Sequence, residues 1–207
     1  MKKLFGIISF IVFASVAMAQ TPQEIVSRMD EEMSKHEKEG MIITIDMKIP
    51  ILGTMSTRTY SIGDKARVEA RMLGNDVIIW TDGTTEWSYT PKDNEITITN
   101  QKVKEKTESE GDAEMLVGIT EGYDVSIDKE TATEWTILCK KSKSNKDKDA
   151  PKRMELVVAK GTYMPVSLKS KMKGSTINMY DISYGVTEEE VTFKAEDYPD
   201  ATIVDKR

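Results

Sequence analysis

Apolar residues in this chain first recur at the spacing of a helix. Residues 21–24, Thr-Pro-Gln-Glu, have the order of a helix start, with Thr at the N-cap, Pro at the first position and Glu closing a capping box. Ile25, Met29 and Met33 then fall on one stripe, and charged residues occupy most of the other side. The pattern therefore predicts one amphipathic helix of about 18 residues that ends at Gly40.

From residue 41 onward the period of the apolar positions changes to two, which is the period of a half-buried strand. Between residues 41 and 98, the turns that separate these strands contain glycine together with proline, aspartate or asparagine, or proline with aspartate and asparagine. The strands expected in this way cover residues 41–49, 54–62, 66–72, 77–80, 87–89, 96–98, 123–127, 134–139, 154–159, 166–172 and 176–184. The last residues, 191–207, are expected to be mostly extended.

The stretch 76–98 predicts an antiparallel hairpin followed by a third strand. Its turn contains Asp-Gly, which supplies the positive φ of a tight turn. A turn over residues 81–84 places Trp80 opposite Thr85. The same turn places Ile78 opposite Trp87. Paired residues project to one side of a sheet, so one broad apolar face is expected here. That face carries Ile78, Trp80, Trp87 and Tyr89.

Two segments interrupt the strand pattern. Residues 102–122 begin as a strongly acidic run and continue with the apolar residues Met115, Leu116 and Ile119, which predicts a loop leading into a small helix. Residues 140–153 hold seven basic side chains against two acidic ones. We interpret this segment as a solvated hairpin tip, and contact with anionic headgroups is the alternative.

The start of the chain has the features of a secretory signal peptide. Lys2 and Lys3 form a positive region, residues 4–16 are apolar, and Ala-Met-Ala at 17–19 is a cleavage box. We therefore expect residues 1–19 to be removed and the mature protein to start at Gln20 in an exported compartment, the periplasm. A membrane anchor is the alternative, but the apolar stretch is short for a span. Residues 20–207 are expected to form a single domain, mainly β with helices.

Charge and composition limit which partners the protein can bind and which residues can form disulfides or perform catalysis. The formal net charge of −6 becomes −8 when Lys2 and Lys3 are removed, and an acidic balance argues against nucleic acid as a partner. Cys139 is the single cysteine, so no internal disulfide can form, and its alternating apolar context predicts a small buried hydrophobe. His36 is the single histidine and continues the apolar stripe of the first helix.

Catalytic and cofactor motifs are not apparent in the sequence. One histidine and one cysteine are too few for a zinc site, and no nucleophile elbow, phosphate-binding loop or dinucleotide fingerprint occurs. We therefore expect no enzyme activity, no metal and no cofactor. Eleven of the 13 methionines lie in the mature chain, and their flexible side chains adapt to variable apolar partners, although ordinary core filling explains any single one equally well.

Residues 78–91 resemble the hairpin of the periplasmic outer-membrane lipoprotein carriers, the LolA family. That hairpin has a Ser-Asp-Gly-Lys turn followed by Trp-x-Tyr-x-Pro; here the turn is 81–84, and Trp87, Tyr89 and Pro91 fall at matching spacing. The order of elements also agrees with the family over nearly the whole mature length.

The end of the chain resembles the family's ending as well. That ending reads F-x-F-x-P-P-x-G-x-x-V-I-D, and the corresponding runs here are 191–193, 198–199 and 203–205. Both motifs occur in the family's order on a chain of this size with a signal peptide.

The resemblance implies an incomplete, strongly curved antiparallel half-barrel, with the N-terminal helix and a short mid-chain helix covering its concave face. It implies a cavity for the acyl chains of lipoproteins and a monomeric carrier that needs no nucleotide. An inner-membrane lipoprotein-releasing transporter and an outer-membrane acceptor are the implied partners. The expected lining consists of Ile25, Met29, Met33, Ile45, Met47, Val68, Met72, Ile78, Trp80, Trp87 and Tyr89.

The implied lid mechanism depends on two further groups of residues. Met115, Leu116 and Ile119 are candidates for an occupant that competes with the acyl chain and permits its release. The family often has a Lys-Arg-Pro run whose arginine helps to latch the lid. This chain has Ile-Gly-Asp-Lys at 62–65 instead, so Lys65 or Arg67 is the expected substitute, at a different spacing.

Two other functions remain open from the sequence. Sigma-regulating periplasmic proteins share the half-barrel, so a sensor of lipids or lipoproteins in an envelope-stress pathway is the first alternative. An enzyme acting on envelope lipid or glycan is the second, and the scarcity of catalytic motifs disfavours it.

Overall fold

The computed structural model describes residues 20–72, 74–101, 116–172 and 174–207. The expected signal peptide, residues 1–19, and most of the acidic interruption, including Met115, lie outside the described residues. The described chain starts at Gln20, whose side-chain amide donates a hydrogen bond of 2.6 Å to Tyr163 Oη.

The described elements are a leading helix, twelve strands and three short helical turns. The helices are α1 (Pro22–Lys35), η1 (Glu37–Glu39), α2 (Glu188–Val191) and η2 (Ala195–Asp197). The strands are β1 (Met41–Ile49), β2 (Gly53–Ile62), β3 (Lys65–Met72), β4 (Asn75–Thr81), β5 (Thr85–Thr90), β6 (Glu95–Asn100), β7 (Tyr123–Glu130), β8 (Glu134–Lys141), β9 (Arg153–Ala159), β10 (Pro165–Met172), β11 (Ser175–Tyr184) and β12 (Thr202–Asp205).

The start of α1 has the capping box that the sequence predicts. Thr21 Oγ1 accepts from the Glu24 backbone N–H at 3.2 Å, and the Glu24 carboxylate accepts from the Thr21 backbone N–H at 2.9 Å. The helix is shorter than expected, because it ends at Lys35 and the 3₁₀ turn η1 follows. Gly40 then leads into β1 with φ 68° and ψ 161°, a region that is essentially restricted to glycine.

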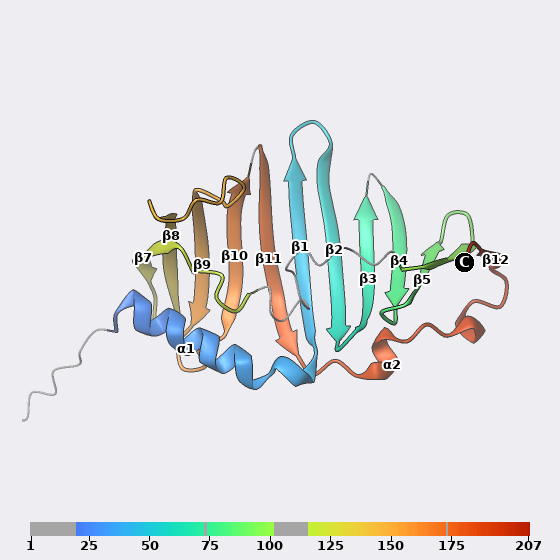
Figure 1. Cartoon of the computed structure of the whole chain (residues 1–207), viewed down its shortest axis with the longest axis horizontal. Coiled ribbons are helices and arrows are strands. Elements are labelled where there is room, and N and C mark those ends of the chain that lie inside the picture. The colour runs from blue at the N-terminus through green and yellow to red at the C-terminus, as the bar shows by residue number, and fades with distance from the viewer. Residues whose placement is uncertain (1–19, 73, 102–115, 173) are drawn as a thin grey trace, which may run out of the picture.

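All twelve strands form one sheet in the order β12-β6-β5-β4-β3-β2-β1-β11-β10-β9-β8-β7 (Figure 1). Every pairing is antiparallel except that of β12 with β6, which is parallel and joins Ile203 to Ile96. The predicted meander is therefore confirmed for β1 to β6. The end of the chain, expected only to be extended, supplies an edge strand of the same sheet.

One face of the sheet packs against α1, and we call it the helix face. Cross-strand pairs run from Ile45 to Met179, then to Leu168, Leu156 and Ile137, so these five side chains project to one side. The core lies between this side and α1. It comprises Ile25, Val26, Met29, Met33, Met41, Ile43, Leu116, Trp135, Ile137, Cys139, Met154, Leu156, Val158 and Leu168.

The expectation of a strongly curved half-barrel is wrong, because the sheet is open and not strongly curled (Figure 1). Its end strands, β7 and β12, lie at opposite ends of the order. The physical reason is that the sheet is covered on different faces at its two ends. Helix α1 packs on the helix face beside β8 to β10, while the segment from α2 to Tyr198 packs on the opposite face beside β4 and β5. Such a sheet does not wrap around a single interior.

The described part of the mid-chain interruption, residues 116–122, forms turns and no helix. None of the helices in the described residues combines the length and the hydropathy that crossing a bilayer requires.

Candidate functional site

Apolar side chains continue across the helix face beyond the area that α1 covers. We call this group the apolar strip, and all of its members are half-buried. It consists of Ile45 and Met47 of β1, Met55 of β2, Val68 of β3, Val77 and Ile79 of β4, and Ile177 and Met179 of β11.

Register places the strip residues on one surface. Met47 pairs with Met55 on one side and with Ile177 on the other. Val68 pairs with Ile79. The β2 residues between these pairs on the same face are threonines, such as Thr57, which pairs with Ile45. The surface therefore combines flexible Met and branched aliphatic side chains with few hydroxyl groups and, over β1 to β4 and β11, no charged side chain among the strip residues.

The strip is continuous with the core. Ile45 and Met179 pack against the core cluster while keeping part of their surface exposed. Ile25, Met29 and Met33 of α1, expected from the sequence to line the same site, are fully buried between the helix and the sheet. A ligand on the strip would meet these three residues only after α1 moved away from the sheet.

The other face carries an aromatic cluster, made of Trp80, Trp87, Tyr89, Phe193 and Tyr198. The Trp80 and Phe193 ring centroids are 5.4 Å apart in an edge-on arrangement, and Trp87 stacks on Phe193 at 5.5 Å. Tyr89 and Tyr198 lie 4.5 Å apart. Trp80 is only 6 % exposed, so the C-terminal segment of the chain already covers this cluster.

The expectation that the hairpin aromatics and the β1 and β3 residues share one lining is therefore wrong. Trp80 pairs with Arg67, whereas Val68 pairs with Ile79, so Val68 and Trp80 project to opposite sides. Ile78, Trp80, Trp87 and Tyr89 do share a face, as the hairpin predicted, but Ile45, Met47 and Val68 lie on the other. Met72 continues β3 through a backbone pair with Asn75, and its side chain lies outside the described part.

The pairing inside the hairpin also differs from the expected one. Trp80 pairs with Trp87, and Ile78 pairs with Tyr89, which is a shift of two residues. The cause is a wider turn, in which one Asp82 carboxylate oxygen accepts from the backbone N–H groups of Thr84 and Thr85 at 2.9 and 2.7 Å. These bonds also hold the pKa of Asp82 below its usual value. A shift of two leaves every side chain on its expected face.

Lys65 and Arg67 both hold helix α2. Lys65 Nζ lies 2.7 Å from a Glu188 carboxylate oxygen, and Arg67 Nη1 donates to the Glu190 backbone oxygen at 3.4 Å. Arg67 also lies over the Tyr60 ring at 4.9 Å and pairs with Glu69. The two residues predicted to latch a mid-chain lid thus contact the C-terminal segment on the aromatic face.

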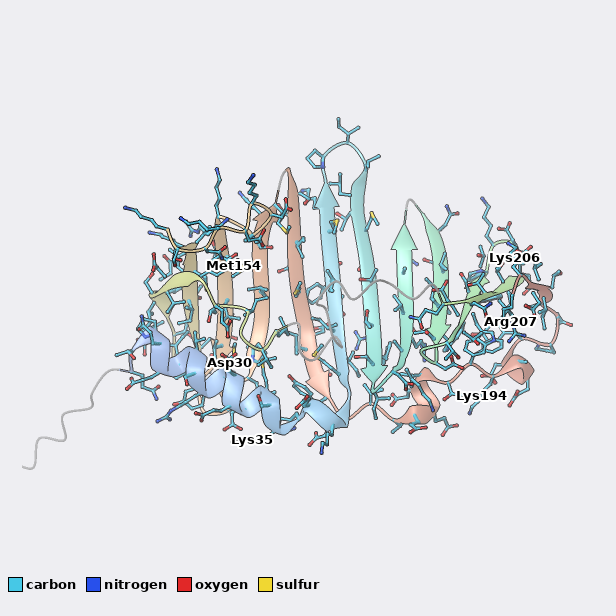
Figure 2. All side chains as sticks on the ribbon, in the orientation of Figure 1. Asp30, Lys35, Met154, Lys194, Lys206 and Arg207 are labelled. Atoms are coloured by element: carbon cyan, nitrogen blue, oxygen red, sulfur yellow. The ribbon has the colours of Figure 1, made fainter. Side chains whose placement is uncertain are left out.

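The described part of the mid-chain segment packs beside α1. Leu116 is only 1 % exposed within the core, and Ile119 is half-buried against it. The Gly118 backbone N–H donates to the Asp30 carboxylate at 3.3 Å. Asp30 lies on α1 (Figure 2), and burial raises the pKa of its carboxyl group although the Gly118 bond opposes this shift.

His36 and Cys139 have structural surroundings, and the described residues form no metal-binding group. Within the described part of the chain, no three His, Cys, Asp or Glu side chains gather where they could hold a metal ion. His36 Nδ1 lies 2.9 Å from a Glu39 carboxylate oxygen, and its ring packs 5.1 Å from that of Tyr184. Cys139 is buried in the core, where desolvation raises the pKa of its thiol to about 11. The apolar side chains of the strip themselves suit contact with apolar groups.

Sequence reasoning missed five of the eight strip residues. Met55 lies in a mostly polar strand, and Val77 and Ile79 alternate with the equally apolar Ile78 and Trp80. Ile177 and Met179 do follow the period of two in β11, so that signal was available.

No family model and no curated protein sequence matches this chain. Among solved structures it is similar to an uncharacterized conserved protein from Thermus thermophilus, at 16% identity and a TM-score of 0.45, covering 89% of this chain and 98% of that one. It is similar to LprF from Mycobacterium bovis at 8% identity and a TM-score of 0.47, covering 81% of this chain and 96% of that one. It is also similar to a LolA superfamily protein from Nitrosomonas europaea at 11% identity and a TM-score of 0.34, covering 86% of this chain and 100% of that one. Likenesses at these identities and TM-scores assign no function to this chain.

Proposed function

We propose that the protein is an exported lipid carrier that shields the acyl chains of lipoproteins on the apolar strip. The single observation that carries this proposal is the strip itself: eight apolar side chains on one face, beside the core and half-exposed. The sequence resemblance at residues 78–91 and the signal-peptide pattern at residues 1–19 fit the same role. In this proposal the carrier collects its cargo at an inner-membrane transporter and passes it to an outer-membrane acceptor.

The energetics of such a surface suit reversible binding. An acyl chain gains about 0.8 kcal/mol for each CH₂ that it buries, so contact with part of a chain already gives useful affinity. Met47, Met55 and Met179 can change rotamer to follow chains of different shape. A half-buried open strip releases its occupant more readily than an enclosed core does, because the occupant keeps part of its contact with solvent.

The proposed role of the covered residues follows from their positions. Ile25, Met29 and Met33 hold α1 against the core at one side of the strip. Leu116 and Ile119 close the same side from the mid-chain segment. Movement of α1 with this segment would enlarge the surface available to an acyl chain. The aromatic cluster takes no part in cargo binding in this proposal.

The test is displacement of a fluorescent fatty-acid probe from the mature protein by a triacylated lipopeptide, with the affinities measured for two double variants. V68S with I79S removes two paired strip residues and is expected to weaken the probe about tenfold. V166S with I203S makes the same kind of change at two exposed apolar residues outside the strip and is expected to leave affinity unchanged. Absence of probe binding by the unaltered protein, or equal losses in both variants, would contradict the proposal.

A further inference from the structure

The β1–β2 turn and loop 142–152 lie at one end of the strands, and we call this end the basic edge. Antiparallel pairing of Lys48 with Thr54 and Thr176 brings the β1–β2 turn beside the start of β11. Pairing of Ser170 with Met154 places loop 142–152, which precedes β9, at the same end. These connections lie along the upper edge in Figure 1. Nitrogen-tipped side chains extend outward from it over β8 to β10 in Figure 2.

A cavity of about 790 Å³ opens at this edge between loop 142–152 and the ends of β9 and β10. Its lining includes six basic residues and two acidic ones, a difference of four positive charges. The basic residues are Lys141, Lys148, Lys152, Arg153, Lys169 and Lys171. Methionine and proline side chains, those of Met154, Met172 and Pro151, supply apolar lining between the charges.

Most of these positive charges are not neutralised by the described residues. Arg153 pairs with Glu155 at 3.0 Å, and Lys141 donates to a backbone oxygen of the loop. The remaining four are Lys148, Lys152, Lys169 and Lys171, and none of their ammonium groups has an ion pair or hydrogen bond to another described residue. Concentrating like charges in this way is unfavourable unless an anion neutralises them, and it occurs on a chain whose formal net charge is −6.

The β1–β2 turn at the same edge exposes two apolar side chains. Ile51 is fully exposed and Leu52 is 58 % exposed. Few large hydrophobic side chains in the described chain are exposed, and these two are adjacent. Ile51 also has φ 73°, a region that β-branched residues rarely adopt. A strained backbone that presents Ile51 to solvent is a feature that indicates a contact with something outside the chain.

We propose that the basic edge docks the protein on an anionic membrane surface. The lysines at the cavity contact headgroup phosphates, and Ile51 with Leu52 enters the interfacial region of the bilayer. Anionic leaflets attract basic residues within a Debye length of the surface, and an inserted apolar side chain adds a contribution that salt does not screen. This combination distinguishes a membrane from a soluble anion, which offers no apolar layer. The inference goes beyond acyl carriage, since none of these residues belongs to the apolar strip.

The experiment measures partition of the mature protein onto vesicles by flotation. Vesicles of phosphatidylcholine alone are compared with vesicles that also contain phosphatidylglycerol, at low and at high salt. The expected result is binding to the anionic vesicles that is at least about tenfold stronger than to the neutral ones and that falls, without vanishing, at high salt. Equal binding to both vesicle types, or none to either, would overturn the proposal.

Variants separate the two contributions. The charge reversals K148E, K152E and K171E together should lower partition at least about tenfold, while I51S with L52S should abolish the part that survives high salt. The matched control reverses three lysines at the opposite end of the strands, K38E, K129E and K206E, and should retain partition. Loss of partition in the control equal to that in the test variant would overturn docking through the basic edge, because net charge alone would then govern binding.

Two further measurements test whether the bound anion is a lipid headgroup or free phosphate, and whether vesicle binding is separate from acyl-chain binding. Inorganic phosphate is added as a competitor; complete displacement by phosphate, with the I51S and L52S pair behaving as unaltered protein, would identify a free-anion site and overturn docking. Fatty-acid probe binding is measured on the same variants and should persist in all of them. Vesicle binding without probe binding by the unaltered protein would leave docking standing and remove acyl carriage.

Discussion

Trp87 and Phe193 stack with their ring centroids 5.5 Å apart and their planes inclined by 17°. The contact joins the central hairpin to a residue far later in the chain, on the face opposite the apolar strip. It explains why much of the aromatic surface of the hairpin is covered: the chain's own C-terminal segment packs against it. The segment is fixed further by Tyr198 against Tyr89 and by Lys65 against Glu188.

Replacing Phe193 by alanine should therefore loosen the C-terminal segment. Phe193 is half-buried and loses contacts with Trp80, Trp87 and Tyr198, so we expect a loss of roughly 2 kcal/mol in the free energy of unfolding. Urea unfolding followed by tryptophan fluorescence measures it. Glu196→Ala, an exposed change in the same segment, is the control and should be near neutral. Equal midpoints for the two variants would show that the aromatic cluster contributes little.

Acid should release the same segment. The ion pair with Lys65 holds the pKa of Glu188 below its ordinary value of 4.5, and the Thr187 backbone N–H does the same for the pKa of Glu190. Because these folded-state pKa values are lowered, their contribution to stability is complete above pH 4.5 and is lost as pH falls through the folded-state values.

Tryptophan fluorescence recorded against pH should therefore change below pH 4.5, as Trp80 and Trp87 lose their cover. Glu188→Gln cannot form the ion pair with Lys65, so part of the acid dependence should be absent in this variant. A titration curve unaltered by the substitution would show that the Lys65–Glu188 pair does not hold the segment.

Gly40 and Gly63 make a matched pair of substitutions. A Cβ at Gly40 would lie 2.5 Å from the Ser61 backbone oxygen and 2.9 Å from Val186 Cβ, whereas a Cβ at Gly63 would meet nothing within 4 Å. Both have positive φ; the backbone cost of an alanine is about 1 kcal/mol at Gly63 and larger at Gly40, whose φ and ψ are nearly restricted to glycine. We expect Gly63→Ala to lose only that much and Gly40→Ala to lose roughly 3 kcal/mol or more. Thermal unfolding compares them, and similar melting temperatures would contradict the packing around Gly40.

Cys139 should be unreactive in the folded protein. Its side chain is fully buried, and the pKa of about 11 leaves almost no thiolate near neutral pH. An aromatic disulfide reagent at mildly alkaline pH should release no chromophore from native protein and one equivalent per chain after denaturation. Rapid reaction of the native protein would show that the core opens readily beside α1.

Period and turn chemistry were sufficient to predict most local structure. The capping box at Thr21, the strand alternation in β1 and β3, and the common face of the hairpin aromatics all follow from short-range rules. Which residues of neighbouring strands lie on the same face of the sheet was not predictable in the same way. β3 has one apolar face, but β4 is apolar on both, with Val77 and Ile79 alternating with Ile78 and Trp80.

The pairing of Met72 with Asn75 decides which residues of β3 and β4 share a face. Because Met72 pairs with Asn75, even-numbered β3 residues pair with odd-numbered β4 residues, and Val68 meets Ile79. A pairing shifted by one residue would have placed Val68 on the side of Trp80, as expected from the sequence. The parallel pairing of β12 and the covering of the aromatic face depend on contacts between distant segments, and no local pattern encodes them.

The methionines offer the most direct test that the apolar strip binds acyl chains. Methyl resonances of residues 20–207, labelled with ¹³C at methionine, are followed by NMR while a lysolipid is added below its micelle concentration. We predict saturable shifts for Met47, Met55 and Met179 on the strip, and little change for Met29 and Met33, which the core encloses. Shifts confined to methionines away from the strip, or no shifts at any methionine, would contradict the account.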